Sequence, residues 1–313
     1  MANEDWRSVE VNPSQRMLRV RDAAFGCIIT GTDKARSGYG NGDCLYIDFR
    51  HGVFALADGS ERHPRSSREI LKRLQASLGR NGSPPDADEW RRMINREVYA
   101  GQRFQHRTTF SCAALRKEER GLSCVVSHGG DSSVMIIDGI DGSVVFRTGR
   151  DMCFAGRSPE IMDVSEICLP VGGCRVVIAS DGFDDLYRYC IQHALLPDFG
   201  SMVWEWPLER IGDELAAVIL RHAGRFEHDD IGFVVFDPHA CTTVVPVSIL
   251  IGGTTPAEEQ RFRELSGQSP EERWLPESIW SERIAELEGI GILPSYPSDM
   301  MMSHQWEVTH ESD

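Results

Sequence analysis

The sequence predicts an α+β protein, a two-layer antiparallel β-sandwich flanked by pairs of helices. Short runs rich in Val, Ile and Phe are bounded by Gly or Asp, which is typical of buried strands. Two of these runs are joined by the Asp-Gly-rich turn at residues 138–142, which predicts a hairpin and therefore antiparallel pairing. The helical patterns come in pairs and do not alternate with strands. This order excludes a doubly wound parallel sheet.

The strands are expected where apolar runs end at turn residues. In chain order these runs are residues 53–57, 122–127, 134–137, 143–147, 176–180 and 231–236. A further strand is expected to begin at Asp43. The run at 231–236 is predicted to be the last strand of the domain.

Four helices are expected in two pairs, over residues 66–78 and 86–98 and then over 184–196 and 208–222. In the first helix, Ser66 and Glu69 have the spacing of a capping box, and Gly79 is the expected C-terminal stop. Apolar residues recur on one face of each segment, so each helix should bury one side.

The chain divides into an N-terminal extension (1–17), a core domain (18–238) and an acidic C-terminal tail (239–313). The tail carries 13 acidic side chains against 4 arginines. Two segments that place a capping residue before a proline predict short helices there. Trp274 and Trp280 belong to an apolar stripe that either docks on the chain's own domain or recruits a partner.

The composition of the 313 residues narrows the class of partner. Its 33 basic and 48 acidic side chains give a formal charge of −15, which argues against binding to nucleic acid or to an anionic membrane. No apolar run approaches 18 residues, and the run at 244–251 is among the longest. The nine cysteines are scattered, with no Cys-x-x-Cys pair, which suits core packing in a reducing, cytoplasmic compartment.

Carboxylates at the ends of buried strands are the strongest functional signal. Asp58 and Asp181 each follow an apolar run directly and precede a glycine. A buried, unpaired carboxylate is costly, and two strand ends that meet at one cation would remove this cost. Asp43 and Asp229 each stand at the start of a strand in a similar setting. All-oxygen ligand sets favour Mg²⁺ or Mn²⁺ over zinc or copper.

The sequence resembles a known family, the metal-dependent protein phosphatases of type 2C. Six short motifs over about residues 18–238 occur in that family's order and rough spacing. They are Asn41-Gly42-Asp43, Asp58-Gly59, Thr108-Thr109, Gly130-Asp131, Ser180-Asp181-Gly182 and Asp229-Asp230. The resemblance implies a two-sheet sandwich that holds two Mn²⁺ or Mg²⁺ ions at one edge, with a possible third.

The resemblance also assigns ligands. Asp58 would bridge both ions, with the Gly59 carbonyl on one of them, and Asp181 and Asp229 would bind the other. A water between two divalent ions loses its proton near neutral pH and attacks phosphorus without a covalent enzyme intermediate.

Further roles follow from the same resemblance. Asp43 would hold waters around the ion pair, and Asp131 matches the acid that binds a third, weaker ion in bacterial members. Arg36 is the nearest candidate for the phosphate-binding arginine. His63 is a candidate general acid, although a loop histidine beside charged residues is more often solvated.

These features favour a cytoplasmic phosphoserine/phosphothreonine protein phosphatase, of the bacterial type, that opposes a kinase. Two alternatives stay open. One is a catalytically silent relative that binds a phosphoprotein or another partner, because the loop at residues 60–64 departs from the family pattern. The other is hydrolysis of a small phosphate ester. No Gly-x-Ser-x-Gly motif supports a serine hydrolase.

Overall fold

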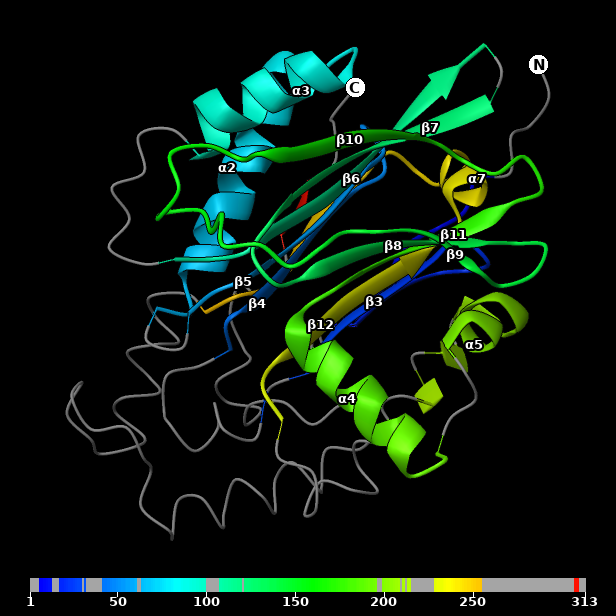
Figure 1. The fold of residues 1–313 in the computed structure, drawn as a ribbon. Helices are drawn as coiled ribbons and strands as arrows, with labels where there is room; N and C mark the ends of the chain where they lie inside the picture. The colour runs from blue at the N-terminus through cyan, green and yellow to red at the C-terminus, as the bar shows by residue number, and fades with distance from the viewer. Residues whose placement is uncertain are drawn as a thin grey trace, which may run out of the picture.

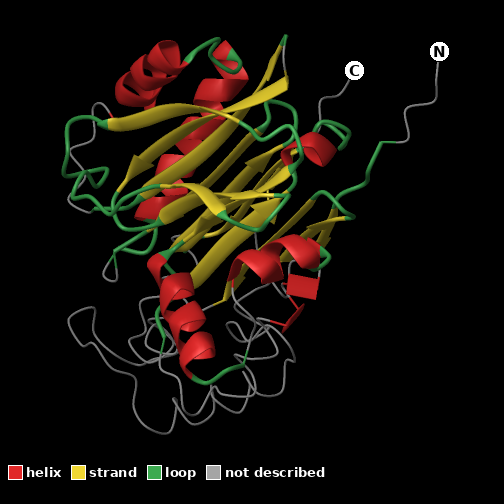
Figure 2. Cartoon of the chain, turned by 45° about the vertical axis from the view of Figure 1, so that its right-hand side comes forward, coloured by secondary structure: helices red, strands yellow, loops and turns green. Residues whose placement is uncertain are grey.

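Two β-sheets lie face to face, with helices on the outer side of each (Figures 1 and 2). The structure is a computed structural model. It describes residues 6–12, 17–29, 31, 41–60, 63–99, 107–119, 121–195, 199–208, 210–211, 213–214, 228–254 and 307–309. The predicted α+β sandwich is confirmed.

The first sheet contains seven described strands, and all neighbouring strands are antiparallel. In spatial order they are β1 (Glu10–Asn12), β2 (Met17–Val20), β3 (Ala24–Ile29), β12 (Ile231–Phe236), β11 (Cys174–Ala179), β8 (Ser133–Asp138) and β9 (Val144–Arg147). The hairpin predicted at residues 138–142 joins β8 to β9. Because β12 lies between β3 and β11, this sheet depends on pairing between segments far apart in the sequence.

The second sheet also contains seven described strands with antiparallel neighbours. Its spatial order is β10 (Asp163–Cys168), β7 (Gly121–Gly129), β6 (Phe110–Glu118), β5 (Val53–Asp58), β4 (Asp43–Asp48), β13 (Ser248–Gly252) and β14 (Glu307–Thr309). All the strands predicted from the sequence are present. β4 begins at Asp43, as expected.

The main hydrophobic core fills the space between the two sheets. Phe54 of β5 stacks on Phe236 of β12, with 3.8 Å between their ring centroids. Cys124 and Cys174 are buried in the same cluster, which confirms that these cysteines act as core residues. Each sheet therefore buries one face against the other, and its second face needs a helical cover.

The helices provide that cover in pairs, as the sequence predicted (Figure 2). Leu74 and Trp90 pack on the second sheet, and Phe183 and Leu186 pack on the first. The helices on the second sheet are α2 (Ser66–Asn81), α3 (Ala87–Met93) and the π-helical segment η1 (Ile94–Tyr99), and those on the first are α4 (Asp181–Gln192) and α5 (Phe199–Glu205). The helix predicted over 208–222 falls largely outside the described residues.

The ends of α2 differ from the prediction. The Ser66 hydroxyl donates a hydrogen bond to the carbonyl of His63 (2.9 Å), so the expected capping box does not form. The helix continues through Gly79 to Asn81 and ends at Gly82, whose φ is +70°. Sequence alone could not separate these two glycines, because the extra turn is stabilised by contacts with another helical segment.

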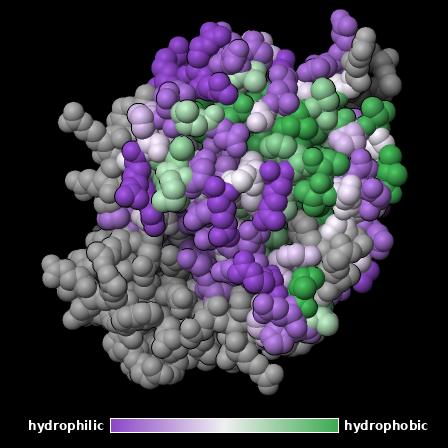
Figure 3. All heavy atoms as spheres, in the orientation of Figure 1, coloured by the Kyte–Doolittle hydropathy of each residue, from purple (hydrophilic) through white to green (hydrophobic). Residues whose placement is uncertain are grey.

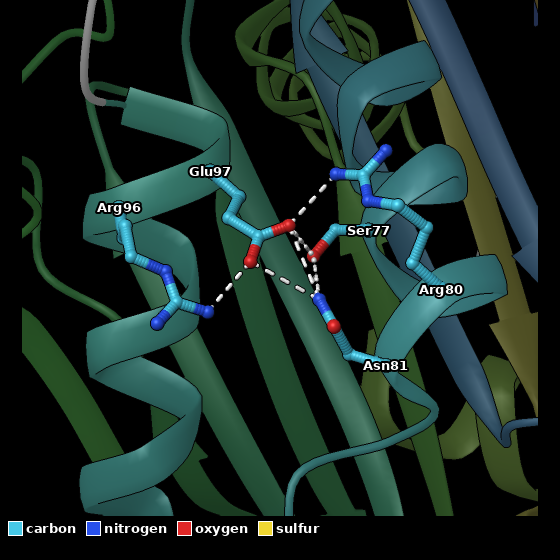
Figure 4. A network of polar contacts seen from close by, with 5 residues as sticks. All are labelled: Ser77, Arg80, Asn81, Arg96 and Glu97. Atoms are coloured by element: carbon cyan, nitrogen blue, oxygen red, sulfur yellow. Dashed lines mark hydrogen bonds and ion pairs between the residues drawn. The ribbon is translucent and has the colours of Figure 1, made fainter.

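Those contacts centre on Glu97 of η1 (Figure 4). Its carboxylate accepts hydrogen bonds from Arg80 (2.8 Å), Ser77 (2.9 Å) and Asn81 (3.1 Å), all on α2. Arg96 adds a further ion pair at 2.6 Å. These hydrogen bonds lower the pKa of Glu97 to about 2, with Arg80 the largest cause. The network ties the last turn of α2 to η1.

The strand β13 corrects the domain boundary predicted at residue 238. It pairs with β4 from Ser248 to Gly252, after the short helix α7 (Pro238–Cys241). Ile249 and Ile251 are fully buried in the core between the sheets. The strand at 231–236 is therefore not the last one of the folded core, because an apolar segment beyond it covers the edge of β4.

Other features expected in the tail lie outside the described residues. These are the two or three short helices expected after residue 254 and the stripe that contains Trp274 and Trp280. None of the described helices has the length and apolar character needed to cross a membrane.

Candidate metal centre

Several strands end at one edge of the sandwich and bring acidic residues together there. Asp43 at the start of β4 pairs in register with Asp58 at the end of β5. In the other sheet, Ser133 at the start of β8 pairs with Ala179 at the end of β11. Asp131 and Asp181 lie two residues beyond these paired positions. Oxygen atoms of Asp58, Asp131 and Asp181 all lie within 4.8 Å of one another.

The three carboxylates face a pocket of about 190 Å³. Asp229, which precedes β12, lines the same pocket. The described lining residues are Asp58, Gly59, Ser60, Arg107, Thr108, Thr109, Asp131, Phe154, Asp181 and Asp229. Hydrophilic residues dominate the molecular face around the start of α4, while hydrophobic residues gather near β9 and β11 (Figure 3). The pocket is thus acidic and polar.

The position of Asp58 is held by the two threonines that precede β6. The backbone N–H of Asp58 donates to the Thr109 hydroxyl oxygen at 2.8 Å, and the Asp58 carbonyl accepts from the Thr108 hydroxyl at 2.7 Å. The Thr109 hydroxyl also shares a hydrogen bond of 2.7 Å with Ser132. Since Ser132 is adjacent to Asp131, these hydrogen bonds fix the positions of Asp58 and Asp131 relative to one another.

The loop that carries Asp131 is shaped by Asp151. The Asp151 carboxylate accepts hydrogen bonds from the backbone N–H groups of Gly130 (2.7 Å) and Cys153 (2.8 Å). Gly130 has a φ of +110°, a conformation that favours glycine. The glycine before Asp131 thus allows the turn that directs the chain into the pocket.

Asp181 is the first residue of α4, directly after Ser180, whose backbone is extended. Burial, followed by the charges of the neighbouring Asp131 and Asp229 carboxylates, raises the pKa of Asp181 to about 6. The next residue must be glycine, because a Cβ on Gly182 would lie 2.1 Å from the carbonyl oxygen of Asp230. The backbone of α4 can therefore lie close against the strand that follows Asp229.

Asp43 and Asp230 are fully buried behind the pocket. The Ser180 hydroxyl donates to one carboxylate oxygen of Asp43 at 2.7 Å, and the other oxygen has no hydrogen-bond partner in the described part of the chain. Burial, followed by the charge of Asp230, raises the pKa of Asp43 well above its usual value. Asp230 accepts hydrogen bonds from the backbone N–H groups of Gly31 (2.8 Å) and Gly42 (2.6 Å).

The structure brings together most of the site residues predicted from the sequence. Asp58, Gly59, Asp131, Asp181 and Asp229 line one pocket. Asp43 lies behind this pocket, fully buried and bonded to Ser180, and is not among its lining residues. Arg36 lies outside the described residues. His63 is described, but it is not among the residues that line the pocket.

Sequence reasoning missed four residues that shape the site. Thr109 accepts the N–H of Asp58, and Asp151 accepts the N–H of Gly130 in the loop that carries Asp131. Asp230 accepts the N–H of Gly31, and Arg107 places a cation in the pocket lining. Thr109 and Asp230 stood inside recognised motifs, so a signal was present. No sequence signal marked Arg107 or Asp151, because the residues next to them in the chain do not show that these segments reach the acidic edge of the sandwich.

The residues present fit divalent cations. The pocket offers carboxylate oxygens, the ligands that Mg²⁺ and Mn²⁺ prefer. Burial, together with the repulsion among three carboxylates that approach within 4.8 Å, raises the pKa of Asp181 when no cation offsets these effects. A bound divalent cation would reverse that shift. The oxygen ligands of the pocket and the raised pKa of Asp181 are therefore both consistent with a site for divalent cations.

Comparison with solved structures identifies the fold. A variant of a bacterial serine phosphatase superimposes with a TM-score of 0.50 and 17% identity, over 68% of this chain and 97% of that chain. The chain has the type 2C phosphatase fold. RsbX in complex with magnesium follows at 0.49 and 16% identity (74% and 98% covered), and the catalytic domain of PstP in complex with 2 manganese ions at 0.47 and 16% (63% and 91%). No family model and no curated protein matches the sequence.

Proposed function

We propose that the protein is a metal-dependent phosphoserine/phosphothreonine protein phosphatase. The observation that carries this proposal is the convergence of Asp58, Asp131 and Asp181 at one edge of a type 2C phosphatase fold. A phosphate ester and three carboxylates repel one another. Such a pocket is therefore suited to phosphate chemistry only when cations lie between them, and it supplies the oxygen ligands that those cations need.

Asp58, Asp181 and Asp229, with the Gly59 carbonyl, would hold two Mn²⁺ or Mg²⁺ ions in this pocket. A third, weaker ion at Asp131 follows from the resemblance to bacterial members. When bound, these ions would polarise the phosphoryl group and lower the pKa of the attacking water.

The chain's own residues position these ligands. Thr109 and Ser132 link Asp58 to the loop of Asp131 through hydrogen bonds of 2.8 and 2.7 Å. Behind them, Asp43 with its raised pKa accepts the Ser180 hydroxyl, which also accepts the Gly232 N–H at 2.9 Å. This contact joins β4 to the start of α4, and so joins the two sheets directly behind the pocket. Rigid ligands of this kind favour one geometry of the bound ions.

The first experiment measures p-nitrophenyl phosphate turnover with Mn²⁺, with Mg²⁺ and with EDTA. We expect turnover with either metal and none with EDTA. Asp58→Ala and Asp181→Asn should each lower turnover by at least about 10²-fold, the scale of losing one main electrostatic element.

Asp141→Asn is the matched control, because Asp141 also precedes a glycine but lies in the exposed β8–β9 turn. It should retain wild-type turnover. Retention of more than a tenth of the rate by Asp58→Ala or Asp181→Asn, under saturating Mn²⁺, would exclude the assignment of these ligands.

The substrate class and cell compartment are part of the same proposal. A phosphoprotein is the proposed substrate, with a cognate kinase as its counterpart, and a reducing cytoplasm suits a chain whose nine cysteines are all free thiols. Phosphoserine and phosphothreonine peptides should be hydrolysed with a higher kcat/KM than p-nitrophenyl phosphate. Equal or lower kcat/KM on the peptides would favour a small-molecule phosphatase.

A further inference from the structure

The described residues of the pocket lining include one cationic side chain and four carboxylates. Among the described lining residues that cation is Arg107, which directly precedes the two threonines that hold Asp58. A cation in an acidic pocket would ordinarily be expected to pair with a carboxylate. The guanidinium of Arg107 instead lies over the ring of Phe154.

The backbone at Arg107 is anchored by hydrogen bonds to the segment that runs from Asp58 to Ser66. Its carbonyl accepts hydrogen bonds from the Ser60 N–H at 3.3 Å and the Ser66 hydroxyl at 3.4 Å. The next residue, Thr108, donates to the Asp58 carbonyl. Arg107 thus extends from a segment whose position is set relative to Asp58.

The guanidinium group is held by an aromatic ring. It lies 5.0 Å from the ring centroid of Phe154, which is itself buried and lines the same pocket. A guanidinium over an aromatic face is attracted by the ring quadrupole and keeps its N–H groups available at the edges. This contact orients the side chain without using its hydrogen-bond donors.

Arg107 makes no ion pair with any described carboxylate, although four line the same pocket. Elsewhere near the site, Arg147 and Arg150 both pair with Asp184 of α4, at 3.0 and 3.6 Å. The N–H donors of Arg107 therefore remain available. Five donors in a planar fork match the oxygens of a phosphoryl group.

We propose that Arg107 binds the phosphoryl oxygens of the substrate in this pocket. The inference rests on the proposed phosphatase function, and it names the residue that grips the phosphate. A phosphate dianion entering this pocket meets four carboxylates, and Arg107 offers it a positive charge separate from any bound metal. The sequence had suggested Arg36 for this role. Arg36 lies outside the described residues, and among those residues Arg107 is the arginine that lines the pocket.

The test measures binding of inorganic phosphate to the full-length, Mn²⁺-loaded protein by isothermal titration calorimetry. Arg107→Ala should weaken phosphate binding about tenfold. The phosphate affinity of Arg107→Lys should lie between those of Arg107→Ala and the wild type, because lysine keeps the positive charge but lacks the planar set of N–H donors. Arg188→Ala is the matched control, an exposed arginine on α4 that pairs with Asp185, and should bind phosphate as the wild type does. Arg36→Ala in the same assay compares the two candidates.

A parallel titration with Mn²⁺ alone separates phosphate binding from effects on the metal ligands. The Arg107→Ala protein should keep its Mn²⁺ affinity within about threefold, because Arg107 contributes no ligand atom. Phosphate affinity within twofold of the wild type in Arg107→Ala would overturn the proposal. So would a loss confined to Arg36→Ala, or an equal loss of Mn²⁺ affinity.

The same measurements distinguish this proposal from the phosphatase function. A wild-type protein that binds phosphate with Mn²⁺ but hydrolyses no ester would refute the function, while a tenfold loss in Arg107→Ala would still support the role of Arg107. If hydrolysis occurs, Arg107→Ala should raise KM for p-nitrophenyl phosphate as well. Absence of phosphate binding to the Mn²⁺-loaded wild type would overturn the role of Arg107.

Discussion

Ile249→Ala tests whether β13 belongs to the folded core. Ile249 pairs with Ile47 of β4 and has no exposed surface. Its side chain lies in the cluster between the two sheets, eleven residues beyond the boundary predicted at residue 238. If the segment after that boundary were an accessory tail, shortening this side chain would have little effect on the stability of the core.

The expected loss follows from the packing around Ile249. The substitution removes three carbon atoms from a fully buried site, and such changes typically cost about 2–5 kcal/mol. β13 has a neighbouring strand on each side, β4 and β14, and the opposite sheet packs on its inner face. The site therefore has little freedom to collapse, and we expect about 3–4 kcal/mol, which is a large share of the 5–15 kcal/mol typical of a whole domain.

Urea unfolding followed by circular dichroism measures this loss. Ile140→Ala is the matched control, since it makes the same chemical change at a residue that is 79% exposed. The control should change the free energy of unfolding by no more than about 0.5 kcal/mol. A loss below about 1 kcal/mol for Ile249→Ala, or equal losses for the two variants, would refute the assignment of β13 to the core.

The remaining predictions concern the chain end, two glycines and Glu97. A protein ending at residue 240 lacks β13, so we expect it to lose cooperative urea unfolding; a sharp transition like that of the full chain would contradict this. Gly182→Ala places a Cβ 2.1 Å from a backbone oxygen and should destabilise by about 1–3 kcal/mol, whereas Gly79→Ala, where a Cβ meets nothing within 4 Å, should stabilise by about 0.5–1 kcal/mol in the same measurement. Glu97→Gln should cost about 1 kcal/mol at pH 7. Because the pKa of Glu97 is lowered to about 2 in the folded state, this difference should be complete above the unfolded-state pKa of about 4.3 and disappear as pH falls toward 2; a pH-independent difference would contradict it.

The elements that the sequence predicted correctly are those whose signals are local. Every strand predicted from an apolar run bounded by turn residues is present in the structure, and the turn at 138–142 forms the predicted β8–β9 hairpin. Paired helical patterns identified the two layers of helix. In each case the periodicity of side chains reports which face is buried, and this holds wherever the element finally packs.

Part of the site was also predictable from the sequence. Asp58 and Asp181 attracted attention because each ends a strand that must be buried, where an unpaired carboxylate is costly. Asp229 was noted in a similar setting, the six motifs added Gly59 and Asp131, and all five residues line one pocket. A desolvation argument needs only the neighbours in the chain, so it works without knowledge of the tertiary structure.

The remaining features depend on contacts between segments far apart in the sequence, and only the tertiary structure decided them. The apolar run at 244–251 was visible, but its pairing with β4 was not. Asp43 was expected to hold waters around the ions, yet its side chain lies buried against Ser180, 137 positions along the chain. Arg107 is an ordinary arginine in the sequence. It becomes a candidate phosphate ligand because Phe154 and the anchored backbone place it beside carboxylates from both sheets. Strand periodicity specifies which side of a sheet a residue occupies, whereas the partner it meets there depends on how distant strands pair.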